Sequence, residues 1–204
     1  MNTYFSKTRV EAFSDGVFAI IVTLLVLEIK VPHVEDHASM PALIDALIPL
    51  FPKVISWMLS FLMLCVIWVN HHRILEQLER ITHGIFWHNA HLLLWCSFIP
   101  FPTALIGDYV GNPVATTVFG VIMAMTAFSF TLMRRNILRS RHVLKATADV
   151  ARFTADTTRS LFFGPVLYLI GAAVSMLHTA AGMAVFAFIP VYFIFFTSAA
   201  PAEH

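Results

Sequence analysis

Apolar residues occur in six long blocks, and most polar and charged residues lie in the segments between them. The blocks cover about 10–29, 51–69, 85–106, 114–133, 161–177 and 180–197. A helix needs roughly 20 apolar residues to cross the hydrocarbon core of a bilayer. The blocks show no strict alternation of apolar and polar residues, which favours helices over the strands of a barrel. The pattern therefore predicts an all-α membrane protein, with residues 1–204 forming a single six-helix transmembrane domain.

The remaining segments predict smaller features. The sequence MPALIDALI, residues 40–48, is expected to form a short surface helix in the longest external loop. Pro100 and Pro102 predict a kink in the third block, because proline removes a helical hydrogen bond. The longest polar stretch, about 134–160, is expected to be a basic cytoplasmic connector. The first block has full spanning length and no small-residue cleavage site, so we expect a retained helix.

Composition and charge support a membrane location and predict an orientation. Hydrophobic residues make up 58% of the chain and charged residues only 12%, about half the charged fraction of a soluble domain. Lys and Arg are enriched in cytoplasmic loops. With both termini in the cytoplasm, only Lys30 and Lys53 of the 13 Lys and Arg residues fall outside. We expect a multi-pass protein of the cell inner (plasma) membrane, surrounded by the lipid bilayer, with no nucleic-acid partner.

The first block carries the most informative pattern. At about 100° per residue around a helix, one stripe contains Ile20, Thr23, Leu24 and Leu27. By the same arithmetic Asp15 lies about 140° from Ile20, on another side of the helix. The carboxylate and the apolar stripe are therefore expected to have different roles.

A carboxylate within a membrane helix is expensive and normally faces protein or water. Asp15 is therefore expected to accept hydrogen bonds in a buried polar network that joins the first three helices. Donor candidates at the same depth are Trp68, Asn70, His71, His72, His88, Asn89 and His91. Arg9 is too far from Asp15 along the helix for an easy contact, so we expect it to pair with a neighbouring helix or with Glu11.

The first helix resembles that of the transmembrane protein 175 potassium channel family. Its R-x-x-x-F-S-D signature is matched here by Arg9, Phe13, Ser14 and Asp15. The segment DGVFAIIVTLLVLEIKVP and the WVNHHR motif at 68–73 also look like the bacterial members. The resemblance covers about the first 110 residues well and the remainder by topology alone. A charged and polar motif is rare at this position of a membrane helix, which makes the signature fairly specific.

The resemblance implies a homotetramer in which the four first helices line a central pore. It implies a hydrophobic constriction at Ile20, with the next rings at Leu24 and Leu27, and a threonine ring for selectivity at Thr23. Such narrow apolar rings can gate by dewetting. The family lacks a carbonyl filter, and this sequence has no TVGYG-like stretch. The expected function is a potassium-favouring cation channel, not an enzyme, with K⁺ as permeant ion and no cofactor.

Other interpretations of the same residues stay open at this stage. Asp15 with His71 or His72 has the chemistry of a proton-conducting protein or a proton-coupled transporter. A membrane enzyme with a histidine-bound metal is a third hypothesis. His88 and His91 share a helix face but have no matching carboxylates, so we expect no metal site. Without the signature, the apolar stripe of the first helix is also typical of ordinary helix packing.

Overall fold

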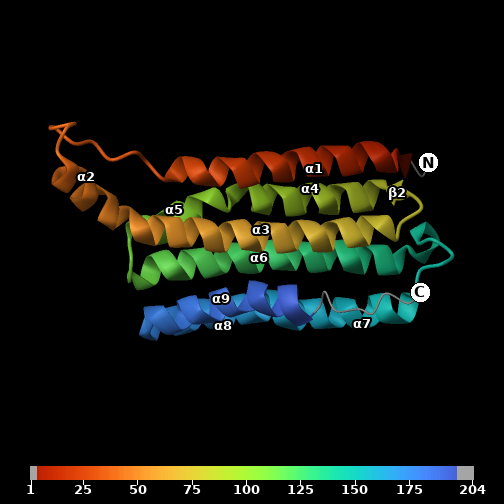
Figure 1. Ribbon diagram of the computed structural model, residues 1–204. Coiled ribbons are helices and arrows are strands. Elements are labelled where there is room, and N and C mark those ends of the chain that lie inside the picture. Colours follow the sequence, from red (N-terminus) through yellow and green to blue (C-terminus); the bar gives the residue numbers. More distant parts are fainter. Residues whose placement is uncertain (1–3, 197–204) are drawn as a thin grey trace.

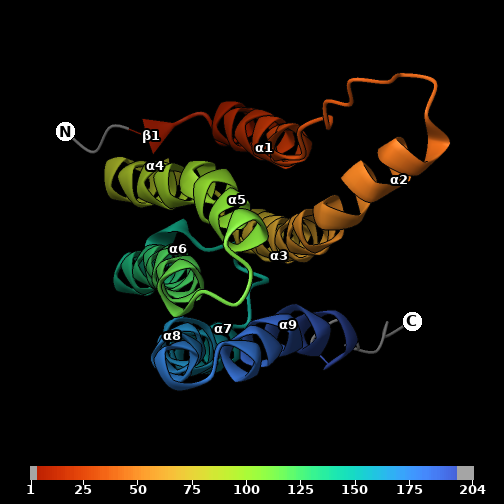
Figure 2. The same cartoon turned by 90° about the vertical axis from the view of Figure 1, so that its left-hand side faces the viewer.

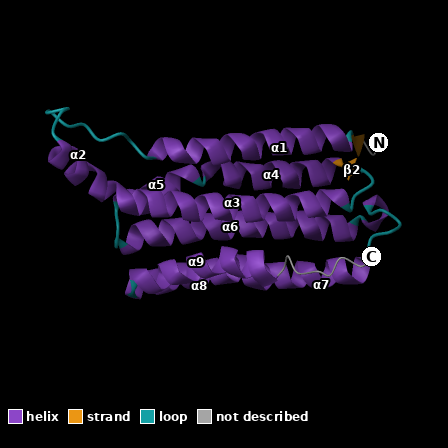
Figure 3. Ribbon diagram, viewed as in Figure 1, coloured by secondary structure: helices purple, strands orange, loops and turns teal. Residues whose placement is uncertain are grey.

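The structure, a computed structural model, describes residues 4–196, and most of them are helical (Figure 3). The elements are, in chain order, β1 (Tyr4–Phe5), α1 (Lys7–Leu24), α2 (Met40–Leu47), α3 (Phe51–Glu76), β2 (Ile81–Thr82), α4 (His83–Phe98), α5 (Pro100–Asp108), α6 (Pro113–Arg139), α7 (Val150–Leu161), α8 (Leu167–Leu177) and α9 (Thr179–Phe196). The two strands pair antiparallel and hold the start of the chain against the α3–α4 turn.

The long helices lie side by side, and α2 projects from one end of the bundle (Figure 1). In the view along the helices, α1 lies at one edge and α8 and α9 lie at the opposite edge (Figure 2). Between them, α6 packs against both α4 and α8. Phe119 of α6 and Phe186 of α9 are fully buried at this junction, with ring centroids 5.5 Å apart. The core is therefore centred on α6, and α1 is peripheral within the subunit.

Five helical stretches among the described residues are long and apolar enough to cross a membrane. They are Lys7–Glu28, Met40–Glu76, His83–Asp108, Pro113–Arg139 and Val150–Leu177. A sixth apolar helix, Thr179–Ile194, is shorter. The helix α9 runs back toward the end at which α1 begins (Figure 1). The last residue of the predicted sixth block, Thr197, lies outside the described residues.

The third predicted span is interrupted at its prolines. Helix α4 ends at Phe98 and α5 begins at Pro100, as expected from a proline within a helix. The amide of Ile99 bonds the carbonyl of Cys96, so the backbone tightens by one residue there. A 2.6 Å hydrogen bond between the hydroxyls of Ser60 and Thr103 then joins α5 to α3.

The stretch 134–160 differs from a plain connector. Helix α6 continues to Arg139 and α7 already begins at Val150, so most of this stretch is helical. Arg134 is only 8% exposed. Its Nε donates to Oγ1 of Thr157 at 3.0 Å, and its guanidinium carbon lies 4.4 Å from the ring centroid of Phe153. Arg134 therefore fixes α7 against the end of α6.

Candidate ion pore

One face of α1 packs inside the subunit. Val10, Ser14, Phe18, Ile21 and Leu25 are buried, and α1 contacts α3 and α4. Their spacing of three or four residues places these side chains on one helical face. Because that face packs inside the subunit, the rotation of α1 about its own axis is fixed. This packing also determines which residues lie on the opposite face.

The opposite face carries the predicted constriction residues. The side chains of Ile20, Leu24 and Leu27 are 59%, 44% and 58% exposed. Gly16 continues the same stripe, and a Cβ added there would meet no atom within 4 Å. Helix α1 forms the edge of the bundle in the view along the helices (Figure 2). The structure thus places this stripe on the outside of the single subunit, where lipid or another copy of the chain can cover it.

The end of α1 changes helix type within this stripe. The α-helix ends at Leu24, and Leu25–Glu28 forms a 3₁₀ turn. Residues three apart eclipse one another in a 3₁₀ helix. The side chain of Leu27 therefore follows that of Leu24 more closely in line than a continuous α-helix would allow.

Thr23 lies on the same exposed face. Its Oγ1 is 2.9 Å from the carbonyl oxygens of both Ala19 and Ile20. A hydroxyl has one hydrogen to donate, and here it is directed at the backbone of its own helix. Beyond the helix, Thr23 offers only oxygen lone pairs, which suit a cation better than an anion.

A buried polar chain joins α1, α4 and α3. Ser14 donates through Oγ to the carbonyl of Val10 at 2.8 Å and accepts from Nδ2 of Asn89 at 2.9 Å. Oδ1 of Asn89 is 2.6 Å from Nε2 of His71. Since Oδ1 can only accept, His71 donates from Nε2, given the amide orientation assigned to Asn89. The three side chains are at most 1% exposed, so the chain of hydrogen bonds lies in the interior of the subunit.

Asp15 lies outside that buried chain, which differs from the sequence prediction. Asp15 is exposed, and its Oδ1 accepts a 2.8 Å hydrogen bond from Nε1 of Trp68. The Trp68 ring in turn stacks on His72, with centroids 5.7 Å apart. Adjacent helical residues point about 100° apart, so only one of Ser14 and Asp15 can face the interior. The hydroxyl is buried and the carboxylate stays at the edge, as the larger cost of burying a charge favours.

The other signature residues do not join this network in the subunit. Phe13 is 54% exposed, and Asn70 donates to the carbonyl of Val66 in its own helix. Glu11 forms its ion pair with Lys7 at 3.5 Å, not with Arg9. Within residues 4–196, Arg9 has neither an ion pair nor a side-chain hydrogen bond. The expected pairing of Arg9 with Glu11 or a neighbouring helix is therefore wrong for the subunit, because Lys7 lies one turn before Glu11 and is better placed.

One contact of this region, between Lys7 and Leu78, could not be predicted from the sequence pattern. Lys7 donates from Nζ to the carbonyl of Leu78, two residues after the end of α3, at 2.8 Å. A backbone carbonyl at the end of a helix is a common partner for lysine, but no residue type marks which one is used. This bond helps to hold the start of α1 beside α3.

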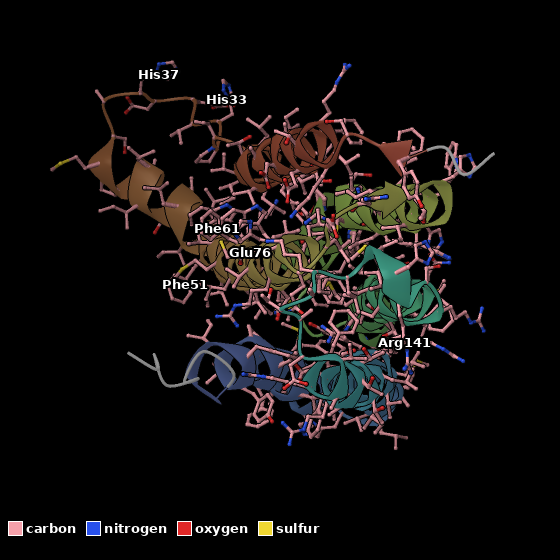
Figure 4. The ribbon with its side chains drawn as sticks, turned by 90° about the vertical axis from the view of Figure 1, so that its right-hand side faces the viewer. His33, His37, Phe51, Phe61, Glu76 and Arg141 are labelled. Atoms are coloured by element: carbon pink, nitrogen blue, oxygen red, sulfur yellow. The ribbon has the colours of Figure 1, made fainter. Side chains whose placement is uncertain are left out.

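The histidines are dispersed among local contacts. In α4, Nε2 of His83 and of His91 accept bonds from the indoles of Trp87 and Trp95, each four residues further on. His33 and His37 lie on the loop before α2, outside the helical bundle (Figure 4). No group of three or more His, Cys, Asp or Glu side chains in the described part of the chain is placed to hold a metal ion.

The chain is similar to known channel proteins over most of its length. A family profile described as "Endosomal/lysosomal potassium channel TMEM175" matches residues 9–100. A potassium channel of Chamaesiphon minutus is 39% identical over 189 residues, which cover 91% of this chain and 92% of that protein. An endosomal/lysosomal proton channel TMEM175 of Gallus gallus is 28% identical over 149 residues, which cover 68% of this chain and 30% of that protein.

The fold is also similar to a solved structure. The crystal structure of a lysosomal potassium-selective channel TMEM175 homolog from Chamaesiphon minutus has a TM-score of 0.81 and 36% sequence identity to this chain. The match covers 95% of this chain and 98% of that chain. The likeness therefore includes α6 to α9, where the sequence analysis found agreement in topology alone.

Proposed function

The chain belongs to the TMEM175 family of ion channels, and we propose that four copies of it form a potassium-favouring cation channel in the inner (plasma) membrane. The family is one of ion channels, which is not an enzyme class, and the apolar helices of the chain make it a multi-pass membrane protein. In the proposed tetramer, α1 of each copy lines the central path. Ile20 forms the constriction, Leu24 and Leu27 form the next rings, and both termini lie in the cytoplasm.

The observation that carries this proposal is the division of α1 into two faces. One face is fixed against α3 and α4, while the face with Ile20, Leu24 and Leu27 is left uncovered at the edge of the subunit. Four such faces around an axis give stacked apolar rings. A narrow apolar ring excludes water when it closes and conducts when it is wetted.

The same geometry explains how the channel works without a carbonyl filter. Lys7–Leu24 is a continuous α-helix, so the backbone carbonyls of this segment accept hydrogen bonds within the helix. Side chains are then the groups that face a permeating ion. On the proposed pore face, Thr23 supplies oxygen lone pairs close to the level of the constriction, and we assign it the role of favouring K⁺.

Replacement of the constriction tests the pore assignment. Ile20→Asn places an amide in the ring, and we expect faster K⁺ flux into liposomes, by roughly tenfold if wetting lowers the barrier by about 1.4 kcal/mol. The matched control is Ile170→Asn in α8, which is also exposed but lies far from α1 (Figure 2). An unchanged flux in folded Ile20→Asn protein, or an equal rise in the control, would rule out the α1 pore.

The assembly is tested separately by mass. Measured in detergent, with bound detergent subtracted, the purified oligomer is expected to contain four chains of 22.9 kDa each. A stable monomer or dimer that still conducts K⁺ in liposomes would contradict the tetramer without touching the family assignment.

Proton conduction is a second candidate function. It is favoured by the exposed carboxylate of Asp15, whose Oδ1 is held by Trp68 next to His72, and by the name of the Gallus gallus relative as a proton channel. A carboxylate at the surface of a membrane helix is suited to carry a proton between water and the pore.

One variant, Asp15→Asn, distinguishes proton conduction from K⁺ conduction. Asp15→Asn keeps an acceptor oxygen for the indole of Trp68 but cannot release a proton. If protons use Asp15, proton flux into liposomes, read by an enclosed pH-sensitive dye, is lost while K⁺ flux is kept. If both fluxes are unchanged, Asp15 has no part in conduction.

A further inference from the structure

A cavity of about 980 Å³ lies on the side of the subunit away from α1, between α3, α6, α7 and α9. One part of its lining is apolar and includes Met63, Met123 and Ile189. The other part is charged and includes Arg73 at the end of α3 and Arg152 and Arg159 of α7. Figure 4 views the molecule from this charged end, where Glu76, another lining residue, is labelled at the end of α3.

The length of the cavity matches one leaflet of a bilayer. Met63 and Arg73 both line it and are ten residues apart in α3, and Met123 and Arg134 are eleven residues apart in α6. At 1.5 Å per residue, each pair spans about 15 to 17 Å along the helix axis. The hydrocarbon core of a bilayer is about 30 Å thick. The cavity therefore runs from a charged mouth at one membrane surface to an apolar end near the midplane.

The lining has more cations than carboxylates, by five to three. Five cations line the cavity, Arg73, Arg134, Lys145, Arg152 and Arg159, against three carboxylates, Glu76, Asp149 and Asp156. Asp149 already accepts a hydrogen bond from the amide of Arg152 and so serves the start of α7. Among the described residues, none of the five cations has a carboxylate within 4.0 Å.

The buried member of this set is Arg134. Its Nε bonds Thr157, and its second terminal nitrogen bonds the carbonyl of Phe153 at 3.2 Å. An arginine has five N–H donors, so these two bonds leave donors for a further acceptor. The nearby carboxylate of Asp156 acts on Arg134 electrostatically, but it makes no ion pair within 4.0 Å. An anionic group that accepts hydrogen bonds from the remaining donors would therefore stabilise this buried cation further.

We propose that this cavity binds one phospholipid with an anionic headgroup, taken from the leaflet on the basic side of the membrane. The acyl chains lie along α3 and α6 toward Met63 and Met123, and the headgroup phosphate is held at the mouth by Arg152, Arg159 and Arg134. The inference does not depend on the ion path along α1, and its test measures binding, not flux.

Native mass spectrometry of the full-length oligomer tests the headgroup. Anionic phosphatidylglycerol and zwitterionic phosphatidylcholine are offered in equal amounts, and phosphatidylglycerol is expected to dominate the bound lipid. In Arg152→Gln/Arg159→Gln its binding is expected to fall roughly tenfold or more. The control Arg135→Gln/Arg139→Gln removes the same charge from exposed positions of α6 that do not line the cavity, and it is expected to keep the wild-type level. Equal binding of the two lipids, or equal losses in the two variants, overturns the proposal.

Two further arms test whether the lipid occupies this cavity and whether its phosphate alone accounts for the binding. Ala155→Trp adds bulk at an exposed lining position and is expected to reduce bound phosphatidylglycerol, whereas Ala151→Trp, exposed on α7 outside the lining, is not. Inorganic phosphate at the concentration of the lipid is expected to leave phosphatidylglycerol bound. If phosphate displaces the lipid, or if Ala155→Trp binds lipid normally, the cavity is not a phospholipid site.

Discussion

At the residue scale, Ser14 and Asp15 show what the sequence can and cannot specify. The signature contains both residues, and the donor residues at the same depth predicted the helices that supply their partners. The requirement that a membrane carboxylate find donors assigned the buried network to Asp15, but the structure builds it on Ser14, with Asn89 between Ser14 and His71. A sequence pattern shows that a charge avoids lipid. It does not show whether the charge is sheltered within one subunit or between subunits.

The buried chain predicts a large effect of losing its central amide. Asn89→Leu leaves Nε2 of His71 and Oγ of Ser14 without these partners in a dry interior. We expect it to destabilise the subunit by about 2 kcal/mol or more, measured as a lower thermal unfolding midpoint in detergent. Asn70→Leu is the control, because the amide of Asn70 bonds only its own helix. A loss of stability in Asn70→Leu equal to that in Asn89→Leu would contradict the proposed importance of the chain.

Thr23 gives a second prediction at this scale. Thr23→Val keeps the shape of the side chain but removes the oxygen that faces the proposed pore. K⁺ flux relative to Na⁺ flux in liposomes is expected to fall several-fold, toward equal permeation. Thr154 makes the same kind of bond to its own helix and is exposed on α7, so Thr154→Val is expected to leave the ratio unchanged. An unchanged ratio in Thr23→Val would remove Thr23 from the selectivity mechanism.

At the element scale, the prolines predicted the helix boundaries better than the polarity of a segment predicted its secondary structure. Pro100 and Pro102 predicted the break between α4 and α5, because a missing backbone donor acts locally and independently of the environment. The polarity of 134–160 predicted a connector, yet α7 is a helix whose buried residues Phe153 and Thr157 are one turn apart. A short amphipathic helix at a membrane surface is polar on average. The roles of Phe153 and Thr157 become visible only when Arg134 is placed beside them, because both residues contact its guanidinium group.

Because α6 packs closely on α8 and α9, a methyl group added at this contact is expected to lower stability, whereas one added at an open position is not. At Gly120, an added Cβ would lie 2.9 Å from Cβ of Ala172 and would also meet the ring of Phe186. Gly120→Ala is therefore expected to destabilise the subunit by about 1–3 kcal/mol. Gly16→Ala has open space and is expected to be neutral or to stabilise α1 by up to about 1 kcal/mol. Equal unfolding midpoints for the two variants would show that the packing at Gly120 can relax.

At the scale of the whole molecule, the sequence predicted both a family and a tetramer, and the tetramer stays a prediction. The six apolar blocks and the signature pointed to the TMEM175 family, and the sequence and structural matches confirm that resemblance. The apolar helices were predictable because they depend on block length alone, while the orientation expected from loop charge stays a prediction. The proposed contacts between copies depend on which face of α1 the rest of the subunit leaves uncovered. That face follows from the packing of Val10, Phe18 and Ile21 against α3 and α4.

If the uncovered faces of α1 from four copies meet at one axis, a cysteine placed on that face is expected to make K⁺ flux sensitive to Cd²⁺. In Leu24→Cys, four thiols would meet around one axis, and Cd²⁺ held by several thiolates would obstruct the path. K⁺ flux in liposomes is expected to stop with Cd²⁺ and to recover with a chelator. Ile170→Cys, exposed on α8, carries the same native Cys65 and Cys96 and is expected to stay insensitive, because its four thiols remain apart. If Cd²⁺ leaves the Leu24→Cys flux unchanged, these residues do not share an axis, and the apolar stripe of α1 faces lipid.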